Sequence, residues 1–194
     1  MSVAAIVLAA GRGSRFGEAP KLLAHLHGKP LVRHVAEAAL ASAADPVFVV
    51  TGHRSGEVEA ALIDLPVVLV PNRAYAEGLS TSLKAGFAAL DPDTEAAIVL
   101  LGDMPLVGPA LIDRLIARWR ESRPAAVVPV VEGQRGNPVV LSTSLRPEVE
   151  RLTGDVGAGP LLRGRADVLE EAMDDEAAVR DVDTPAALAA LSAR

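Results

Sequence analysis

The sequence predicts an α/β protein with a single Rossmann-like, mostly parallel central sheet and helices on both of its faces. Short apolar runs typical of buried strands alternate with amphipathic segments of helical spacing. Half of the 194 residues are hydrophobic and only 3% are aromatic, so small side chains are available to fill the space between helices and sheet. Because the chain contains no repeat, linker or low-complexity tract, we expect one domain over residues 1–194.

Strands and helices alternate through the first half of the chain. Residues 3–8 form an apolar run that predicts a first strand buried on both faces. Residues 30–41 predict a helix, because Pro30 suits the first turn and Leu31 and Val35 fall on one face. The other elements of this half are strands expected at residues 47–51, 67–70 and 96–101 and helices expected at residues 56–62 and 80–90. Repeated β-α-β units favour parallel strands.

The second half continues the alternation with shorter elements. Residues 109–120 predict an amphipathic helix with Leu115 and Trp119 facing inward. Thr184 followed by Pro185 is a helix start, with the threonine as N-cap. The remaining elements are strands expected at residues 125–130, 138–141 and 167–171 and helical pieces expected at residues 145–152 and 159–163.

Composition excludes several classes of function. The formal net charge of −6 argues against nucleic acid or an anionic membrane as a partner. The chain has no cysteine, which excludes disulfides, iron–sulfur ligation and a thiol nucleophile. Its N-terminus lacks the charged region of a signal peptide, and no apolar run approaches the ~18 residues of a membrane span. We therefore expect a cytoplasmic enzyme.

The loop after the first predicted strand is the most informative stretch of the chain. It carries Gly11, Gly13 and Gly17, and Lys21 follows after Pro20. Glycines let backbone N–H groups approach a ligand closely, and lysine and arginine side chains add positive charge. A loop of amides and cations at the carboxyl end of a strand predicts a polyphosphate site.

Two known phosphate-binding loops do not fit this stretch. A P-loop ends in Gly-Lys-Ser or Gly-Lys-Thr, and neither tripeptide follows here. A dinucleotide-binding loop needs its third glycine one position earlier than Gly17, and Pro20 interrupts the segment that should enter the helix. Taken alone, the loop can equally be a tight surface turn with solvated arginines.

Ligands of doubly wound sheets lie beyond the carboxyl ends of the strands. That rule brings four predicted loops to one edge, at residues 11–21, 51–52, 71–72 and 102–103. Asp103 stands at the tip of the fourth strand, where a carboxylate can hold Mg²⁺ together with its waters. The alternative for Asp103 is a turn residue that precedes Pro105.

The glycine loop resembles a nucleotidyltransferase signature. It reads Leu8-Ala9-Ala10-Gly11-x-Gly13-Ser14-Arg15-Phe16-Gly17, followed by Lys21. It is similar to the signature of nucleotidyltransferases with a GT-A-like fold, and most similar to their molybdenum cofactor cytidylyltransferase branch, which includes MobA-like and MocA-like proteins. The resemblance continues, in order, through Gly28-Lys-Pro30, Pro71-Asn72, Gly78-Leu-Ser80-Thr-Ser82, Gly102-Asp103-Met104-Pro105, Gln134-Arg135-Gly136-Asn137-Pro138, Gly154-Asp155-Val-Gly157 and Asp181-Val-Asp183-Thr184-Pro185.

The resemblance implies a Mg²⁺-dependent enzyme, with Mn²⁺ as the alternative ion. The implied reaction transfers CMP from CTP to the phosphate of molybdenum-bearing molybdopterin and releases pyrophosphate, and it implies a molybdoenzyme or its maturation factor as a protein partner. Lys21, Arg15 and Asp103 are the implied catalytic groups. Asp183 is the implied second metal ligand, with Asp181 as the alternative.

The resemblance also implies two sets of binding residues. The nucleotide set is Leu8, Ala9, Ala10, Gly11, Gly13, Ser14, Arg15, Lys21, Thr51, Gly52, Asn72, Ser82 and Asp103. The acceptor set is Arg135, Gly136, Asn137, Gly154 and Asp155. The family usually has histidine where Asn137 stands and arginine where Gly159 stands, so the acceptor is less well defined than the nucleotide.

Ala10 bears on the choice of nucleotide. Family members that resemble guanylyltransferases carry glycine at this position, and the extra methyl group of alanine predicts CTP over GTP. Three alternatives stay open: a transferase that uses GTP or another small phosphorylated acceptor, a nicotine blue oxidoreductase, and a non-catalytic carrier of the molybdenum cofactor. The late third glycine argues against hydride transfer, and Asp103 with Lys21 argues against a mere carrier.

Overall fold

One eight-stranded sheet organises the chain in our computed structural model, which describes residues 2–13, 16 and 20–192. The strand order is β10-β7-β9-β6-β1-β4-β5, and β8 pairs with β7 outside this path. The strands are β1 (Ser2–Ala9), β4 (Val47–Thr51), β5 (Val68–Pro71), β6 (Thr94–Leu101), β7 (Ala126–Val131), β8 (Gln134–Arg135), β9 (Val139–Ser142) and β10 (Val168–Ala172). A separate hairpin joins β2 (His25–Leu26) to β3 (Lys29–Pro30).

The sheet is mostly parallel, as the sequence predicts. β1 lies in its middle and pairs in parallel with β4 and β6, so that Ala5 faces both Val47 and Ile98. β4 is parallel to β5, and β7 is parallel to β10. β9 runs antiparallel to both of its neighbours, β6 and β7, and β8 is antiparallel to β7. The sequence gives no sign of this reversal, because a short apolar run has no direction.

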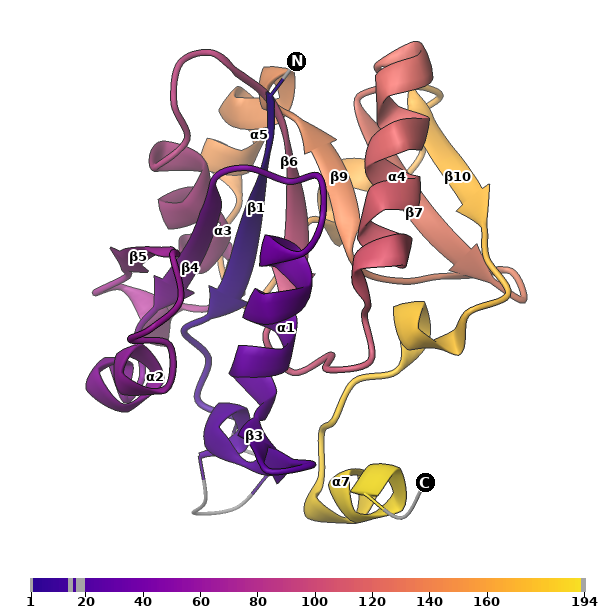
Figure 1. Cartoon of the computed structure of the whole chain (residues 1–194). Coiled ribbons are helices and arrows are strands. Elements are labelled where there is room, and N and C mark those ends of the chain that lie inside the picture. The colour runs from indigo at the N-terminus through magenta and orange to yellow at the C-terminus, as the bar shows by residue number, and fades with distance from the viewer. Residues whose placement is uncertain (1, 14–15, 17–19, 193–194) are drawn as a thin grey trace.

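Helices cover both faces of the sheet (Figure 1). They are α1 (Leu31–Leu40), α2 (Ser55–Ala61), α3 (Leu79–Ala88), α4 (Pro109–Ser122), α5 (Arg146–Arg151), α6 (Gly159–Leu162) and α7 (Pro185–Ser192). Buried residues of α1, α2 and α4 pack on one face, and those of α3, α5 and α6 pack on the other. No helix in the described part of the chain is long and apolar enough to cross a membrane.

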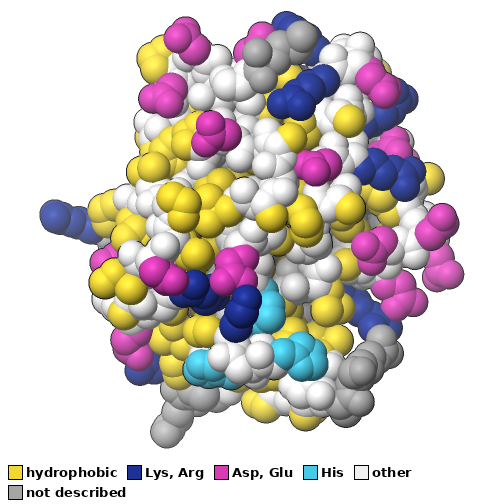
Figure 2. Space-filling model, viewed as in Figure 1, with side chains coloured by type: hydrophobic (Ala, Val, Ile, Leu, Met, Phe, Trp, Pro, Cys, Tyr) yellow, Lys and Arg dark blue, Asp and Glu magenta, His cyan; other side chains and the backbone are white. Residues whose placement is uncertain are grey.

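β1 divides the core between these two faces. Val3, Ala5 and Val7 belong to the cluster that includes α1 and α4, whereas Ala4 and Ile6 belong to the cluster that includes α3. All of these side chains are buried, which explains why the strand is continuously apolar instead of alternating. Outside the core, basic and acidic side chains are interspersed over the face that carries α1 and α4 (Figure 2).

Most predicted elements are present, with shifted ends. Pro30 ends β3 and directly precedes α1 instead of forming its first turn. The predicted helix at residues 145–152 is divided into a short 3-10 turn, Thr143–Leu145, and α5. The Thr184 cap is confirmed, because the backbone N–H of Ala187 donates to its Oγ1 over 3.2 Å.

Candidate active site

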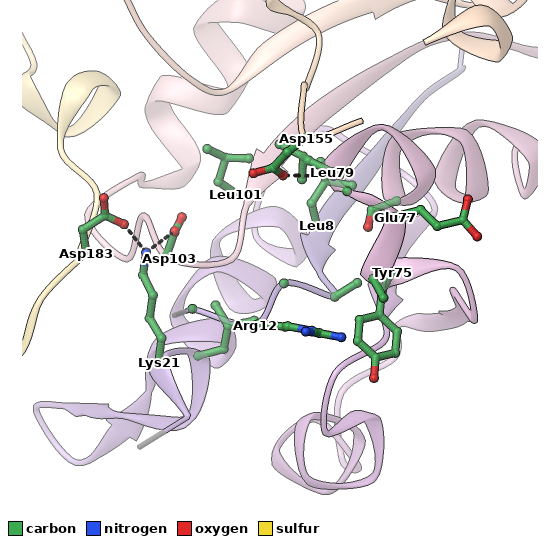
Figure 3. A pocket seen from close by; sticks show the side chains of 17 residues that line it. Leu8, Arg12, Lys21, Tyr75, Glu77, Leu79, Leu101, Asp103, Asp155 and Asp183 are labelled. Carbon is green, nitrogen blue, oxygen red and sulfur yellow. Dashed lines mark hydrogen bonds and ion pairs between the residues drawn. The ribbon is translucent and has the colours of Figure 1, made fainter. Parts of the chain in front are cut away.

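A pocket of about 650 Å³ opens at the carboxyl ends of β1 and β6. Its walls come from the glycine loop, the 3-10 turn Tyr75–Glu77, the start of α3, and the segments that carry Asp155 and Asp183 (Figure 3). Loops that are distant in sequence therefore meet at the predicted sheet edge, as expected for parallel strands whose carboxyl ends point the same way.

Lys21 forms the centre of a charged cluster at one end of this pocket. Its Nζ donates a hydrogen bond to Oδ2 of Asp103 over 2.6 Å and a second one to Oδ1 of Asp183. Only 8% of the Lys21 side chain is exposed, against 23% for Asp103 and 35% for Asp183. In Figure 3 the ammonium group stands between the two carboxylates.

These neighbours determine the protonation of Lys21. Burial lowers the pKa of Lys21, but the hydrogen bonds and charges of Asp103 and Asp183 outweigh burial and raise the pKa above its ordinary value. Lys21 is thus an ammonium ion at neutral pH. The pKa of Asp181 is raised by burial and by the negative charges of Asp183 and Asp103, while Lys21 opposes the rise.

The acidic residues around Lys21 fit a divalent cation. Asp103, Asp181 and Asp183 each offer a carboxylate oxygen, and these oxygens lie within 4.8 Å of one another. In the described part of the chain, Oδ1 of Asp103 is buried and has no hydrogen-bond partner. A buried acceptor without a donor, next to two further carboxylates, matches the oxygen ligands that Mg²⁺ and Mn²⁺ prefer. Asp181 therefore joins the predicted pair as a candidate ligand.

Close backbone packing fixes the position of Asp103. The N–H of Gly102 donates to the carbonyl of Leu8 over 3.0 Å, and a Cβ on Gly102 would lie 3.1 Å from the same oxygen. From the other side, the N–H of Val182 donates to the carbonyl of Asp103 over 2.9 Å. This last bond brings the segment that carries Asp183 to the tip of β6.

The glycine loop folds back on Lys21. Gly13 has a φ of +59°, and a Cβ at this position would lie 2.7 Å from Cβ of Lys21. A side chain at residue 13 would thus be strained and would displace the lysine. Gly11 is exposed beside the pocket. The predicted phosphate-binding residues Ser14 and Arg15 lie outside the described residues.

The other end of the pocket contains an aromatic side chain, Tyr75. Cζ of Arg12 lies 5.8 Å from the centroid of the Tyr75 ring, and the His53 ring centroid is 6.0 Å from it. A Cβ on Gly52 would lie 2.8 Å from Cβ of both Ala10 and Tyr75, so the glycine allows Tyr75 to pack against the tip of β1. Ala10 lines the pocket, and Gly52 supports the wall from behind.

Two polar residues predicted to contact nucleotide are buried behind the pocket wall instead. Thr51 Oγ1 donates to Oε1 of Glu59 over 3.2 Å. Nδ2 of Asn72 donates to Oγ of Ser82 over 3.1 Å and to Oγ1 of Thr81 over 2.8 Å. Ser82 itself lines the pocket, so Asn72 positions it.

The predicted acceptor residues are divided between two places. Gly154 and Asp155 dock on the start of α3: Asp155 Oδ1 accepts a hydrogen bond from the N–H of Leu79, and the Gly154 carbonyl accepts one from the N–H of Ser80, both over 3.2 Å. A Cβ on Gly78 would lie 2.4 Å from the Gly154 backbone. Asp155 lines the pocket in consequence.

The other three lie away from the pocket lining. Arg135 donates to Oε1 of Glu170 over 2.8 Å and to a backbone carbonyl in α6 over 3.0 Å. A Cβ on Gly136 would lie 2.1 Å from the carbonyl oxygen of Ala178, and the N–H of Asn137 donates to that oxygen over 2.7 Å. These contacts attach the 3-10 turn Glu176–Val179 to the sheet.

Sequence reasoning placed Arg12 among the cations of the glycine loop, and Arg12 lines the pocket, but it missed Tyr75. Tyr75 is the single tyrosine of a chain with only 3% aromatic residues, and it stands between Asn72 and Gly78, which were both singled out. This rarity is the one signal in the sequence that could have identified Tyr75 as a pocket residue.

Comparison with known proteins gives relatives over nearly the whole chain. Nicotine blue oxidoreductase from Paenarthrobacter nicotinovorans is 31% identical over 191 residues, which cover 94% of this chain and 92% of that protein. Bifunctional protein GlmU from Halorhodospira halophila is 40% identical over 116 residues, or 59% of this chain. The match spans only 24% of that GlmU protein.

Solved structures show the same fold. The crystal structure of Rv0371c from Mycobacterium tuberculosis H37Rv matches with a TM-score of 0.87 and 27% identity, and covers 100% of this chain and 99% of that one. A complex of Rv0371c with manganese matches with a TM-score of 0.81 and the same coverage. Residues 5–175 match the family described as the MobA-like NTP transferase domain. The chain therefore belongs to the MobA-like NTP transferase domain family and is a nucleotidyltransferase.

Proposed function

We propose that this nucleotidyltransferase transfers CMP from CTP to the phosphate of molybdopterin that carries molybdenum. The observation that carries the proposal is the cluster of one lysine ammonium and three carboxylates at one end of a pocket at the strand tips. Nucleotidyl transfer needs the negative charge of the phosphates to be held and offset, and it needs little covalent chemistry from the protein.

The triphosphate lies at the charged end of the pocket in this proposal. Lys21 and Arg15 would bind phosphate oxygens, and Asp103 and Asp183, with Asp181, would hold Mg²⁺ or Mn²⁺. The bound ion would offset negative charge on the triphosphate and on the leaving pyrophosphate. The complex of the Rv0371c relative with manganese supports a divalent cation in this fold.

The reaction is an in-line substitution at the α-phosphorus of the nucleotide. An oxygen of the acceptor phosphate forms a new bond to that phosphorus, and the bond from phosphorus to pyrophosphate breaks. A phosphate monoester is already mostly ionised near pH 7, with a second pKa of about 6, so the protein has no need of a general base. Lys21 stabilises the leaving group as its charge grows.

The nucleobase lies at the opposite end, against Tyr75. The tip of β1 with Ala10, the Ser82 hydroxyl and the Tyr75 ring line this end. An aromatic ring beside a guanidinium group offers a stacking surface that suits a flat base. The Ala10 methyl group narrows the space beside the β1 tip, which favours a pyrimidine over a purine.

The acceptor approaches along the wall formed by Gly154 and Asp155. In this proposal Arg135, Gly136 and Asn137 act on acceptor binding indirectly, because they fix the neighbouring part of the sheet. A molybdoenzyme or its maturation factor would receive the dinucleotide product.

A direct assay tests the proposed reaction. Purified protein is incubated with Mg²⁺, one nucleoside triphosphate and molybdopterin with molybdenum bound, and both pyrophosphate and dinucleotide are measured. We expect both products in equal amounts with CTP and less of both with GTP. Pyrophosphate without dinucleotide would contradict the acceptor, and neither product with any nucleotide would contradict the reaction.

Hydride transfer is the second candidate, because the relative named nicotine blue oxidoreductase matches almost the full length of the chain. The three carboxylates around Lys21 do not favour it, since hydride transfer releases no pyrophosphate whose charge a bound metal ion would offset. The discriminating measurement is the absorbance of NADPH with an oxidised dye as acceptor. Dye-dependent loss of NADPH that survives Asp103→Asn would favour the oxidoreductase.

A further inference from the structure

Nζ of Lys21 and the candidate metal ion would occupy the same position between the carboxylates. Nζ of Lys21 donates to both Asp103 and Asp183, and these two residues belong to the three whose oxygens lie within 4.8 Å of one another. Nζ of Lys21 lies 2.6 Å from Oδ2 of Asp103 and also donates to Oδ1 of Asp183. An ammonium group in hydrogen-bond contact with both carboxylates leaves no room for a metal ion between them.

Charge balance gives the Lys21 ammonium group a role beside the three carboxylates. The Lys21 side chain is only 8% exposed, and carboxylates gathered this closely repel one another unless a cation lies between them. Lys21 supplies that cation in the structure described here. Its removal would take one positive charge away from these carboxylates.

The lysine stem allows the ammonium group to leave without unfolding the loop. Its four-carbon chain is flexible beyond Cβ. Its root is fixed by the close approach of Gly13, where an added Cβ would lie 2.7 Å from Cβ of Lys21. Rotation about the outer bonds can thus turn Nζ from the carboxylates toward the open pocket that Lys21 lines.

We propose that Lys21 is a stand-in cation, which occupies the metal site until a divalent ion arrives together with the triphosphate and which then moves to the phosphate oxygens. This inference rests on the proposed nucleotide-binding function of the pocket. The exchange makes metal and nucleotide binding cooperative. Both ligands require Lys21 to leave the carboxylates, so the binding of either one makes it easier for the other to bind. Metal alone must compete with the ammonium group and binds weakly.

Mn²⁺ binding without nucleotide tests this exchange. The free Mn²⁺ concentration is followed by electron paramagnetic resonance in the wild type and in Lys21→Met, Lys21→Arg and Lys29→Met. We expect Lys21→Met to bind Mn²⁺ at least ~10-fold more tightly than the wild type, within the usual range of coupling between sites. Lys21→Arg keeps a cation and should bind weakly. Lys29, which is 50% exposed and paired with Glu37, controls for the loss of one surface charge.

Two outcomes would overturn the exchange. Equal or weaker Mn²⁺ binding by Lys21→Met means that the lysine does not compete with the metal. If Lys21→Met is unfolded, its circular dichroism is measured with and without Mn²⁺, and failure of Mn²⁺ to restore the fold also contradicts a replaceable cation.

The outcome of the Mn²⁺-binding experiment does not depend on whether the proposed reaction occurs. Tighter Mn²⁺ binding by Lys21→Met, in a protein whose wild type makes no dinucleotide from CTP, supports the exchange and contradicts the reaction. Dinucleotide formation by the wild type, with unchanged Mn²⁺ binding in Lys21→Met, supports the reaction and contradicts the exchange.

Discussion

Lys21 and Asp103 are 82 positions apart in sequence, yet Nζ of the lysine lies 2.6 Å from Oδ2 of the aspartate. The first residue follows the glycine loop and the second follows β6, so their contact joins the two strand tips that frame the pocket. The same carboxylate pairs with Lys21 here and would hold the metal ion in the proposed enzyme, so one of these two contacts excludes the other.

Asp103→Asn should lower kcat by at least ~100-fold, the scale of removing one major electrostatic stabiliser. The substitution keeps the shape of the side chain but removes a charge that the proposed cation needs. Because Asp103 lies at a strand tip outside the apolar core, the melting temperature should change little. Asp91→Asn, at an exposed position before β6, is the matched control. Near-normal turnover by folded Asp103→Asn would exclude a metal role for this residue.

Chelation of divalent cations should abolish turnover and leave the fold intact. Lys21 already offsets the carboxylate charge in the absence of metal, so the circular dichroism spectrum should not change with chelator. Added Mg²⁺ or Mn²⁺ should restore dinucleotide formation. Full turnover in excess chelator would remove the metal from the mechanism, and loss of the fold would give it a structural role instead.

Tyr75→Ala should raise KM for CTP with a smaller effect on kcat. Stacking of a base on an aromatic side chain contributes ~1–3 kcal/mol, or roughly 5- to 150-fold in affinity. Tyr75→Phe keeps the ring and should behave like the wild type. If Phe loses as much affinity as Ala, the hydroxyl group and not the ring is responsible, and the proposed stacking is wrong.

Gly78→Ala should destabilise the protein and reduce turnover. Gly78 has a φ of +116°, and an added Cβ would lie 2.4 Å from the Gly154 backbone, so the turn that carries Asp155 must move away from α3. Gly56→Ala is the contrasting change: it lies within α2, its Cβ meets no described atom within 4 Å, and helix propensity predicts a gain of up to ~1 kcal/mol. Thermal or urea unfolding of both variants measures the difference. Equal stability of the two would contradict the tight approach of the turn.

Ala10→Gly should narrow the preference for CTP over GTP. One methyl group in a binding pocket is worth ~1–3 kcal/mol, or roughly 5- to 150-fold, so the wild type should prefer CTP without excluding GTP. The comparison is kcat/KM for both nucleotides in both proteins. A wild-type preference for GTP would overturn the cytidylyl assignment and leave nucleotidyl transfer in place.

The sheet edge was predictable, whereas the lining of the pocket was only partly so. Asp103 could be placed because an apolar run ends just before it and parallel strands deliver their carboxyl ends to one edge. Tyr75 could not be placed in this way. Its position depends on the missing side chain of Gly52, which is a tertiary contact with no local pattern in the sequence.

Side-chain hydrogen bonds between distant parts of the chain explain the other differences. Asn72 has the side chain of a ligand-binding residue, but it donates to Thr81 and Ser82 and so holds the start of α3. Arg135 looks equally suited to an anionic acceptor, yet it pairs with Glu170, which the sequence places 35 residues away. A sequence pattern reveals that a polar group is present, but only the fold shows which partner satisfies it.

The late position of β9 in the chain has a consequence for biosynthesis. Until β9 is made, the apolar strand β6 has an open edge where Ala96–Val99 will later pair, and open apolar edges invite pairing with other chains. Asp155 and Asp183 also follow β9, so the pocket gains these two lining residues only after β9 has been made. The exposed edge of β6 is therefore covered only when β9 pairs with it.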